Sequence, residues 1–497
     1  MIETYRSFGL EMMNALFSKS KDAKHPLLCF VWLAGLYGLG IFFWGKFLSW
    51  GTTPLDFHDW AAITMPRLDM LRDAFQLGVF PFHALDTTAL HEITDRFLVL
   101  PDVITTPQTL LLLFVNINTF VIIDILLHYT LGMLGLIWLR QKKSLSLIAF
   151  TVLFILFNFN GYILAHYAVG HFTWNGYFLY PIVMGLMFEF TEGLVGWKWV
   201  CRLSLVLFYI VLVGGQHHFV WLILFILPFA LTSWKRAKWI LVVIFIAGLL
   251  SAVRFIPPVL ALSYFAKKAE FNFVLGYPSI FHLLQSMILP KVPVESPVLP
   301  YVLNTFEENF WEFNYYIGLL GAVFVIYFGV WRWFGKHAKE YFSFILPAFF
   351  VLFLSLGSNY WLIRAANIPL FASERVASRM ISVPMTLLIL LATIFFQRWL
   401  DEHYHSSIVK MVSFLFLALV LSDLWANLKL WRVSDYAGYF KPVPLNLDGN
   451  SVANHADPIY YTSIAIGLGI TLATAIFLAI MTWHEHQHSR EMVIKVS

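Results

Sequence analysis

Long hydrophobic runs, separated by shorter polar stretches, cover most of the chain between residues 27 and 482. Many approach twenty residues, the length that an α-helix needs to cross about 30 Å of hydrocarbon. The pattern predicts about twelve transmembrane helices, of which the fifth and sixth are short enough to be re-entrant. The expected ranges are 27–48, 108–138, 144–165, 173–190, 200–214, 217–234, 238–257, 315–333, 342–357, 379–397, 408–427 and 459–482.

The composition indicates an integral membrane protein. Hydrophobic residues make up 59% of the chain and charged residues 12%, and the mean hydropathy is +0.73, which separates it from soluble domains. The net charge of +4 does not indicate nucleic-acid binding, because the basic residues form short clusters between the runs. Cys29 and Cys201 both lie within apolar runs, which argues against a disulfide framework or a cysteine metal site.

We therefore expect an all-α polytopic membrane protein with one transmembrane domain over residues 1–497 and no separate soluble domain. No cleavable signal peptide is apparent, since the first run, near Leu27, is long enough to remain as an anchor. The histidines near the C-terminus (HEHQH) are spaced too simply to demand a metal, and a solvated tail is the simpler interpretation.

Four basic clusters predict the orientation. With an even alternation of spans they all fall on one face, which the positive-inside rule makes cytoplasmic. Both termini are then cytoplasmic, in an inner-membrane protein whose long connections 49–107, 258–314, 358–378 and 428–458 lie outside. We expect function in these connections. The clusters are Lys19, Lys21 and Lys24; Arg140, Lys142 and Lys143; Lys235, Arg236 and Lys238; and Arg332, Lys336 and Lys339.

The first long connection contains an amphipathic pattern at 65–77. Apolar residues recur at helical spacing there, with Arg67, Asp69, Arg72 and Asp73 largely between them. The pattern fits a helix lying on the membrane surface, and equally a helix packed on the bundle.

Acidic residues follow the first span in the stretch GTTPLDFHDW, where Asp56, His58 and Asp59 stand close together. A carboxylate at this position can act as a general base and take a proton from an attacking hydroxyl. A carboxylate pair can also hold a divalent ion, but the two acids are three residues apart and no metal is indicated. The alternative is helix capping by Asp59, which the spacing alone favours.

Arginines at the outer ends of later spans form a candidate phosphate site. Arg254 precedes two prolines in SAVRFIPP, and Arg375 and Arg379 lie one helical turn apart in ASERVASRM. Guanidinium groups match phosphate oxygens geometrically. The alternatives are snorkelling to the lipid headgroups and an ion pair with Glu374.

Further polar residues gather at the outer ends of spans three to six and eight. Their side chains can hydrogen-bond sugar hydroxyls, and Trp174 can stack on a sugar face. Haem ligation is disfavoured, because the first two histidines are five residues apart and point to different helix faces. The acid before span eight can pair with an arginine or bind an acceptor. The residues are His166, His171, Asn175, Gln216, His217, His218 and Glu312.

Taken in order, these stretches resemble the GT-C superfamily of integral membrane glycosyltransferases, most closely its bacterial YfhO-type branch. The resemblance covers about residues 50–425, and it is carried by the joint order of several stretches. They are DWAAITMP running into LRDAFQLGVFP, then HYTLGMLGL, GYILAHYAVGHFTW, GGQHHF, AVRFIPP, WEFNYYIGLLG and ERVASRM.

The resemblance implies a GT-C fold with a catalytic acid in the first outer loop, here Asp59 with Asp56 nearby. It implies a polyprenyl-phosphate sugar as donor and a hexosyl or pentosyl group transferred with inversion at the outer face. We expect no cofactor; a divalent metal remains an open alternative that the sequence does not indicate. Arg254, Arg375 and Arg379 would hold the lipid phosphate. The chain departs from many relatives in lacking a large C-terminal soluble domain and an Asp-x-Asp pair. The substrate would be bound by His58, His166, His171, Asn175, His217, Glu312 and Glu374.

Two other classes of function remain as alternatives. A transporter or lipid flippase would need polar residues along a path near mid-membrane, whereas the charges here gather at one face. A structural or accessory subunit of a membrane complex would keep the scaffold and bind protein partners without catalysis, since a fold does not determine function.

Overall fold

The fold is described from a computed structural model that covers residues 11, 13–19, 25–265, 273–290, 310–335, 339–368, 370–438, 440–443 and 451–496. Within this part all regular elements are helical, and extended segments meet only in isolated β-bridges. The all-α prediction is confirmed for the described residues.

Seven helical segments within the described residues are long and apolar enough to cross a membrane, as expected for a multi-pass membrane protein. An eighth arises if α11 (Trp234–Leu250) and the first part of α12 (Ala252–Phe265), which meet at a bend of 72°, count as one broken span. The seven are α2 (Pro26–Phe47), α4 (Ile117–Lys142), α5 with α6 (Leu147–Val169), α15 with α16 (Trp311–Phe334), α19 with its preceding turn (Ala377–Glu402), α20 with α21 (Ser407–Ala437) and most of α22 (Pro458–Gln487).

The other four predicted spans are helical but short, so the count of about twelve spans is not confirmed. Glycine and proline interrupt the helices: Gly214 follows α8, and Pro228 separates α9 from α10. At 1.5 Å per residue, the 16 residues of α8 extend only about 24 Å. The short elements are α7 (Tyr180–Glu192), α8 (Trp197–Leu212), α9 (Gln216–Ile226), α10 (Phe229–Thr232) and α17 (Ile345–Leu354).

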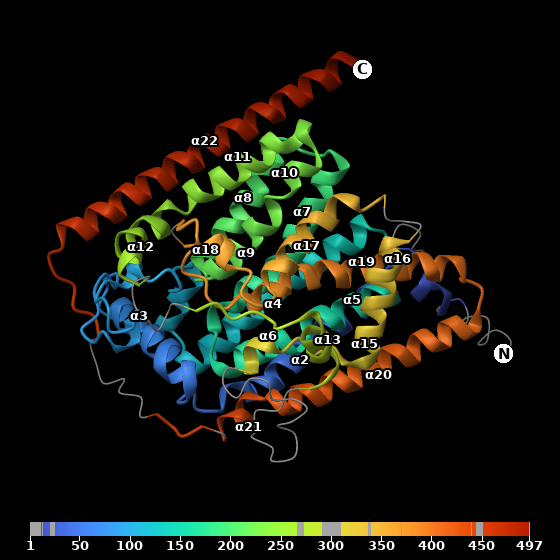
Figure 1. The fold of residues 1–497 in the computed structure, drawn as a ribbon, viewed down its shortest axis with the longest axis horizontal. Helices are drawn as coiled ribbons and strands as arrows, with labels where there is room; N and C mark the ends of the chain where they lie inside the picture. The colour runs from blue at the N-terminus through green and yellow to red at the C-terminus, as the bar shows by residue number, and fades with distance from the viewer. Residues whose placement is uncertain are drawn as a thin grey trace.

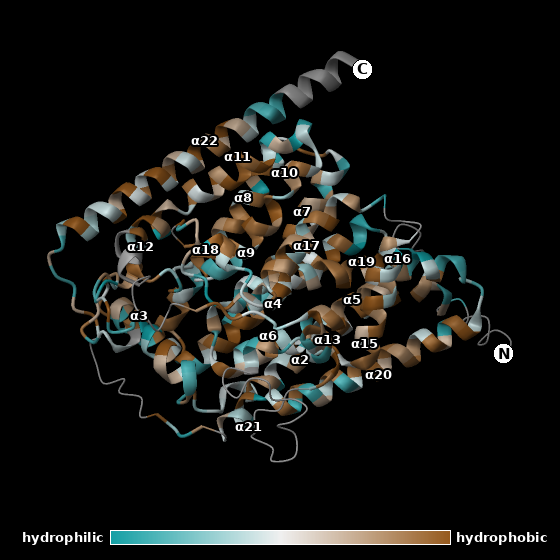
Figure 2. Cartoon of the chain, in the orientation of Figure 1, coloured by the Kyte–Doolittle hydropathy of each residue, from teal (hydrophilic) through white to brown (hydrophobic). Residues whose placement is uncertain are grey.

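The bundle has a buried centre and an apolar periphery. Every residue of α5 (Leu147–Asn158) and α6 (Gly161–Val169) is buried, whereas α20 and α22 lie along opposite edges of the molecule (Figure 1). Hydrophobic residues continue onto the outer faces of these edge helices (Figure 2), as is expected where lipid replaces water.

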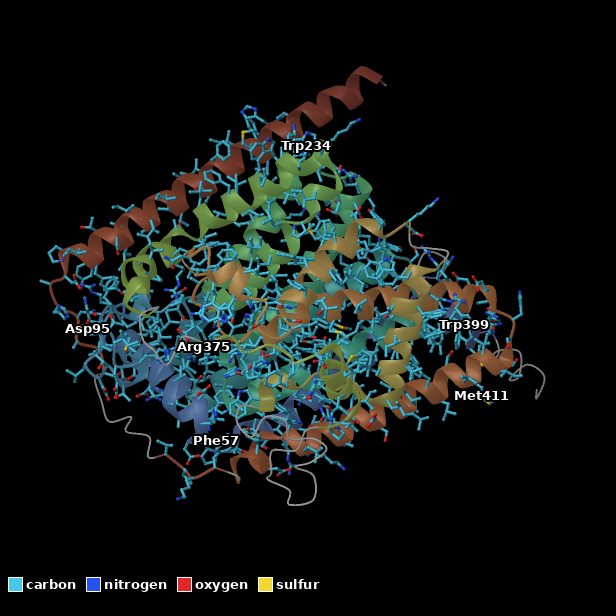
Figure 3. The ribbon with its side chains drawn as sticks, viewed as in Figure 1. Phe57, Asp95, Trp234, Arg375, Trp399 and Met411 are labelled. Carbon is cyan, nitrogen blue, oxygen red and sulfur yellow. The ribbon has the colours of Figure 1, made fainter. Side chains whose placement is uncertain are left out.

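Asp95, in the first long connection, and Trp399, near the end of α19, lie at opposite edges of the molecule (Figure 3). Which of these edges faces the cytoplasm stays a prediction of the positive-inside rule.

The amphipathic pattern forms α3 (Met65–Gln76), which is packed on the protein. Eight of its 12 residues are buried, and these include the polar residues Arg67, Asp69 and Asp73. Burial raises the pKa of Asp69 to about 6, against the lowering effect of the nearby Arg72 charge. Of the two alternatives, the helix packed on the bundle is therefore the one observed.

Candidate functional site

A cavity of about 410 Å³ lies between the first long connection, the turn after α6, the start of α9 and the segment before α19. Four arginines and two carboxylates are among its charged lining residues. The titratable lining residues are Asp59, Arg67, His91, Asp102, His171, His217, Arg364, Arg375 and Arg379.

Asp59 and Arg379 line this same cavity, although they come from the first long connection and the start of the α19 segment. Nε2 of His171 lies 3.0 Å from Oδ2 of Asp59. Burial raises the pKa of Asp59, but the hydrogen bond and charge of His171, together with the charges of His58 and Arg379, lower it below its ordinary value. Asp59 is therefore an ionised acceptor at neutral pH.

Gly170 holds Asp59 in place through a close backbone contact. It has φ +100°, and a Cβ built there would lie 2.3 Å from the backbone N of Trp60. The hydroxyl of Thr64 donates a hydrogen bond of 2.9 Å to the Gly170 carbonyl. Only glycine fits this conformation and this approach, which joins the Asp59 turn to the end of α6.

His171 connects Asp59 to a second histidine. Its Nδ1 lies 2.7 Å from Nδ1 of His166, and its ring lies 4.6 Å from that of Trp174. Burial lowers the pKa of His171 below its ordinary value, against the opposing effect of the hydrogen bond to Asp59. His166 is fully buried behind this contact and does not line the cavity.

Glu312 forms a two-point ion pair with Arg379. Nε of Arg379 donates to Oε2 of Glu312 at 2.6 Å, and Nη2 donates to Oε1. The guanidinium also lies 5.0 Å from the ring centre of Trp174. Of the two roles considered for Glu312, the pairing with an arginine is the one observed.

The ligand atoms of His166, His171 and Glu312 lie within 4.8 Å of one another, a spacing that could hold a metal ion. A cation there would have to compete with Arg379 for Glu312. For that reason we assign no metal to this group.

Glu374 pairs with His217 instead of an arginine side chain. Its Oε2 accepts hydrogen bonds from Nδ1 of His217 at 2.9 Å and from Nε1 of Trp221 at 2.8 Å. Oε1 accepts from the backbone N–H of Arg375 and of Val376. Burial raises the pKa of Glu374, but the charge and hydrogen bond of His217 lower it to about 2. The carboxylate thus orients His217, which lines the cavity.

Arg254 does not line the cavity, so it does not belong to the phosphate site that the sequence predicted. Its Nη2 donates to the backbone carbonyls of Leu100, Pro101 and Val103 at 3.0, 3.2 and 3.0 Å. Its side chain is buried, so the bent start of α12 turns it toward the polypeptide rather than toward a ligand. It supports the loop that forms one wall of the cavity.

Glu312 and Glu374 lie outside the cavity lining as well, and so do three other predicted residues, Asp56, His58 and Asn175. Asp56 accepts a backbone hydrogen bond from Val443, and His58 contacts the ring of Trp311 at 4.7 Å. Asn175 is buried and donates to Asp124 within α4 at 2.6 Å. A direct contact of these side chains with a substrate in the cavity is therefore not supported.

Four charged or titratable residues of the cavity were not predicted from the sequence as site residues: Arg67, His91, Asp102 and Arg364. Nη1 of Arg67 lies 2.8 Å from Oδ2 of Asp102, and its Nη2 lies 3.2 Å from Nε2 of His91. Burial raises the pKa of Asp102, but the charge of Arg67 and other nearby groups lower it to about 2. The sequence signal for Arg67 was its place in the amphipathic pattern at 65–77. In such a pattern the polar residues are expected on the exposed side of the helix, whereas Arg67 is buried.

No protein-family model matches the chain, and no significant match exists to a curated protein or to a solved structure. The resemblance to the GT-C superfamily therefore stays a prediction carried by the order of the sequence motifs.

Proposed function

We propose that the chain is an integral inner-membrane glycosyltransferase that moves a sugar from a polyprenyl-phosphate donor to an acceptor hydroxyl at the extracytoplasmic face. The observation that carries this proposal is the shared cavity of Asp59, Arg375 and Arg379. This cavity combines a carboxylate that can accept a proton with guanidinium groups that can bind a phosphate.

In the proposed reaction, Asp59 takes the proton of the acceptor hydroxyl as its oxygen attacks the anomeric carbon of the sugar. The acceptor oxygen forms the new bond on the opposite side from the phosphate, and the C–O bond to the phosphate breaks. The electron pair of that bond stays on the phosphate oxygen. Arg375 and Arg379 stabilise the negative charge that develops there, which preorganised cations do without reorganising.

The neighbours of these groups support the assignment. His171 hydrogen-bonds Oδ2 of Asp59, which keeps the carboxylate ionised and oriented. His217, held by Glu374, lines the same cavity and is positioned to contact a sugar or phosphate oxygen.

Apolar lining residues accompany the charged ones, as a lipid-linked donor requires. Leu68, Leu71 and Phe97 line the cavity, and so does Val259 of α12, which is 45% exposed. The polyprenyl chain of the donor would extend past Val259 of α12 toward the membrane.

The test is transfer from radiolabelled polyprenyl-phosphate sugars by the purified full-length protein. Replacing Asp59 with Asn should reduce transfer by about 10²- to 10⁴-fold, the usual contribution of a general base. Asp56→Asn is the matched control, because Asp56 is close in sequence but does not line the cavity. Full activity of Asp59→Asn, with the protein still folded and inserted, would exclude the proposed base.

One observation favours transport as a second candidate. Asp124 and His128 are buried inside α4, with the carboxylate bound by Gln108 at 2.9 Å and by Asn175. The span centres are thus less uniformly apolar than expected, and ionisable groups within the membrane often mark transport paths. Substrate flux into proteoliposomes in the absence of sugar transfer, lost in Asp124→Asn, would support this candidate over the transferase.

A further inference from the structure

A second cluster of titratable side chains lies where the first long connection meets the segment before α22. One ligand atom from each of His83, Asp95 and His455 lies within 4.8 Å of the others. The cluster shares no residue with the cavity. Asp95 lies at the edge of the molecule, well apart from Arg375 (Figure 3).

The backbone brings the three side chains together. A β-bridge joins His83 to Arg96, next to Asp95, and another joins Ala84 to Val452. The backbone N of Ala84 donates to the carbonyl of Asp95 at 2.7 Å. Three extended segments are therefore held side by side, and each of them supplies one member of the cluster before any ligand binds.

His83 has an unused ring nitrogen. The side chain is fully buried, and its Nδ1 has no hydrogen-bond partner among the described residues. Its Nε2 lies 3.4 Å from Oδ2 of Asp457, so the proton belongs on Nε2 and the lone pair on Nδ1. A carboxylate that accepts the second N–H of a histidine is the usual partner of a metal-binding imidazole.

His455 and Asp95 complete the set. Nε2 of His455 lies 2.7 Å from Oδ2 of Asp95, and the two histidine rings lie 3.9 Å apart, centre to centre. Close approach of two imidazoles and a carboxylate is favourable when a cation lies between them. Arg96 pairs with Asp457, not with Asp95, at 2.6 Å, so Asp95 remains available as a ligand in this cluster.

We propose that His83, Asp95 and His455 bind a divalent transition-metal ion, with Zn²⁺ as the best match to two imidazole nitrogens and one carboxylate oxygen. Tetrahedral Zn²⁺ with bonds of about 2.1 Å places its ligands about 3.4 Å apart, which is within the 4.8 Å limit that the three ligand atoms meet here. Mg²⁺ and Ca²⁺ prefer oxygen ligands and fit the set poorly.

The ion would fasten the segment before α22 to the first long connection. Asp457, which contacts His83, directly precedes the first residue of α22, Pro458. A metal bound only in the folded state would stabilise this junction by mass action. This inference does not depend on the proposed transferase activity.

The experiment uses the full-length protein, purified with a histidine-free tag and stripped with a chelator. Because His484, His486 and His488 near the C-terminus could bind Zn²⁺ themselves, the reference protein carries alanine at these three positions. Calorimetric titration with ZnCl₂ and elemental analysis should give one bound ion per chain. The thermal unfolding midpoint should rise with Zn²⁺ and stay unchanged with Mg²⁺.

In the same background, His455→Ala and Asp95→Asn should lose the bound ion and the thermal shift. Both side chains are partly exposed, 53% and 40%, so their replacement should leave the fold intact. His405→Ala, at another exposed histidine, should bind Zn²⁺ as the reference does. Unchanged Zn²⁺ affinity in His455→Ala, or no binding by the reference protein, would overturn the proposal.

Discussion

Nε2 of His171 lies 3.0 Å from Oδ2 of Asp59, so the ionised carboxylate at the cavity wall is held by a histidine from the turn after α6. Since this contact offsets the effect of burial on the carboxylate pKa, it determines the pH range in which Asp59 can accept a proton. The proposed chemistry therefore depends on two segments that are far apart in the sequence.

Replacing His171 with Ala should shift the acid limb of the kcat/KM profile for sugar transfer to higher pH. Burial raises the pKa of Asp59, but the hydrogen bond and charge of His171 and other nearby charges hold it below its ordinary value, so the carboxylate stays ionised to a lower pH than a free carboxyl group. Without His171, burial raises this pKa and the base is protonated at a higher pH. His171→Gln, which can still donate a hydrogen bond, should shift the limb less. An identical acid limb in His171→Ala would contradict the role of this contact.

Glu312→Gln should destabilise the protein by about 3–5 kcal/mol, because it leaves the guanidinium of Arg379 without its buried carboxylate. Arg379→Gln should have a similar cost for the converse reason. The double variant should be more stable than the sum of the two single effects predicts, as measured by unfolding in detergent. Additive effects would mean that the two side chains do not stabilise one another.

Arg375→Gln should weaken binding of the lipid-linked sugar by about 10-fold or more, the loss expected for one hydrogen bond to a charged group. The half-buried side chain lines the cavity, and its guanidinium lies 5.4 Å from the ring centre of Phe273. Equilibrium binding of the donor is the measurement. Arg254→Gln is the comparison variant, because Arg254 does not line the cavity. Loss of its three hydrogen bonds to backbone carbonyls should lower the free energy of unfolding by about 3 kcal/mol. A donor affinity unchanged in Arg375→Gln would remove this residue from the phosphate site.

Gly170→Ala should lower the thermal stability and the transfer activity together. Alanine at φ +100° costs about 1–2 kcal/mol, and its Cβ would press on the backbone of Trp60, next to Asp59. Gly78→Ala, also at positive φ but with open space around the Cβ position, separates the backbone strain from the contact. Equal effects of the two substitutions would show that the approach to Trp60 does not matter.

The local hydrophobic pattern was enough to predict an all-helical membrane protein and to place the candidate residues at the ends of its helices. Helix formation and membrane burial depend on residues close in sequence, so a run such as 379–397 carries its own signal. The same reasoning expected Asp59, Arg375 and Arg379 on one side of the membrane, and all three line one cavity.

Only the tertiary structure decided which partner each charged side chain has. Nothing near Arg254 in the sequence indicates that the loop at residues 100–103 folds over it, and nothing near Arg67 indicates that the polar side of α3 faces inward. Glu312 and His217 likewise acquire their partners through contacts between distant segments. Charge and hydropathy locate such residues along the chain, but their pairing depends on how loops and short helices pack in space.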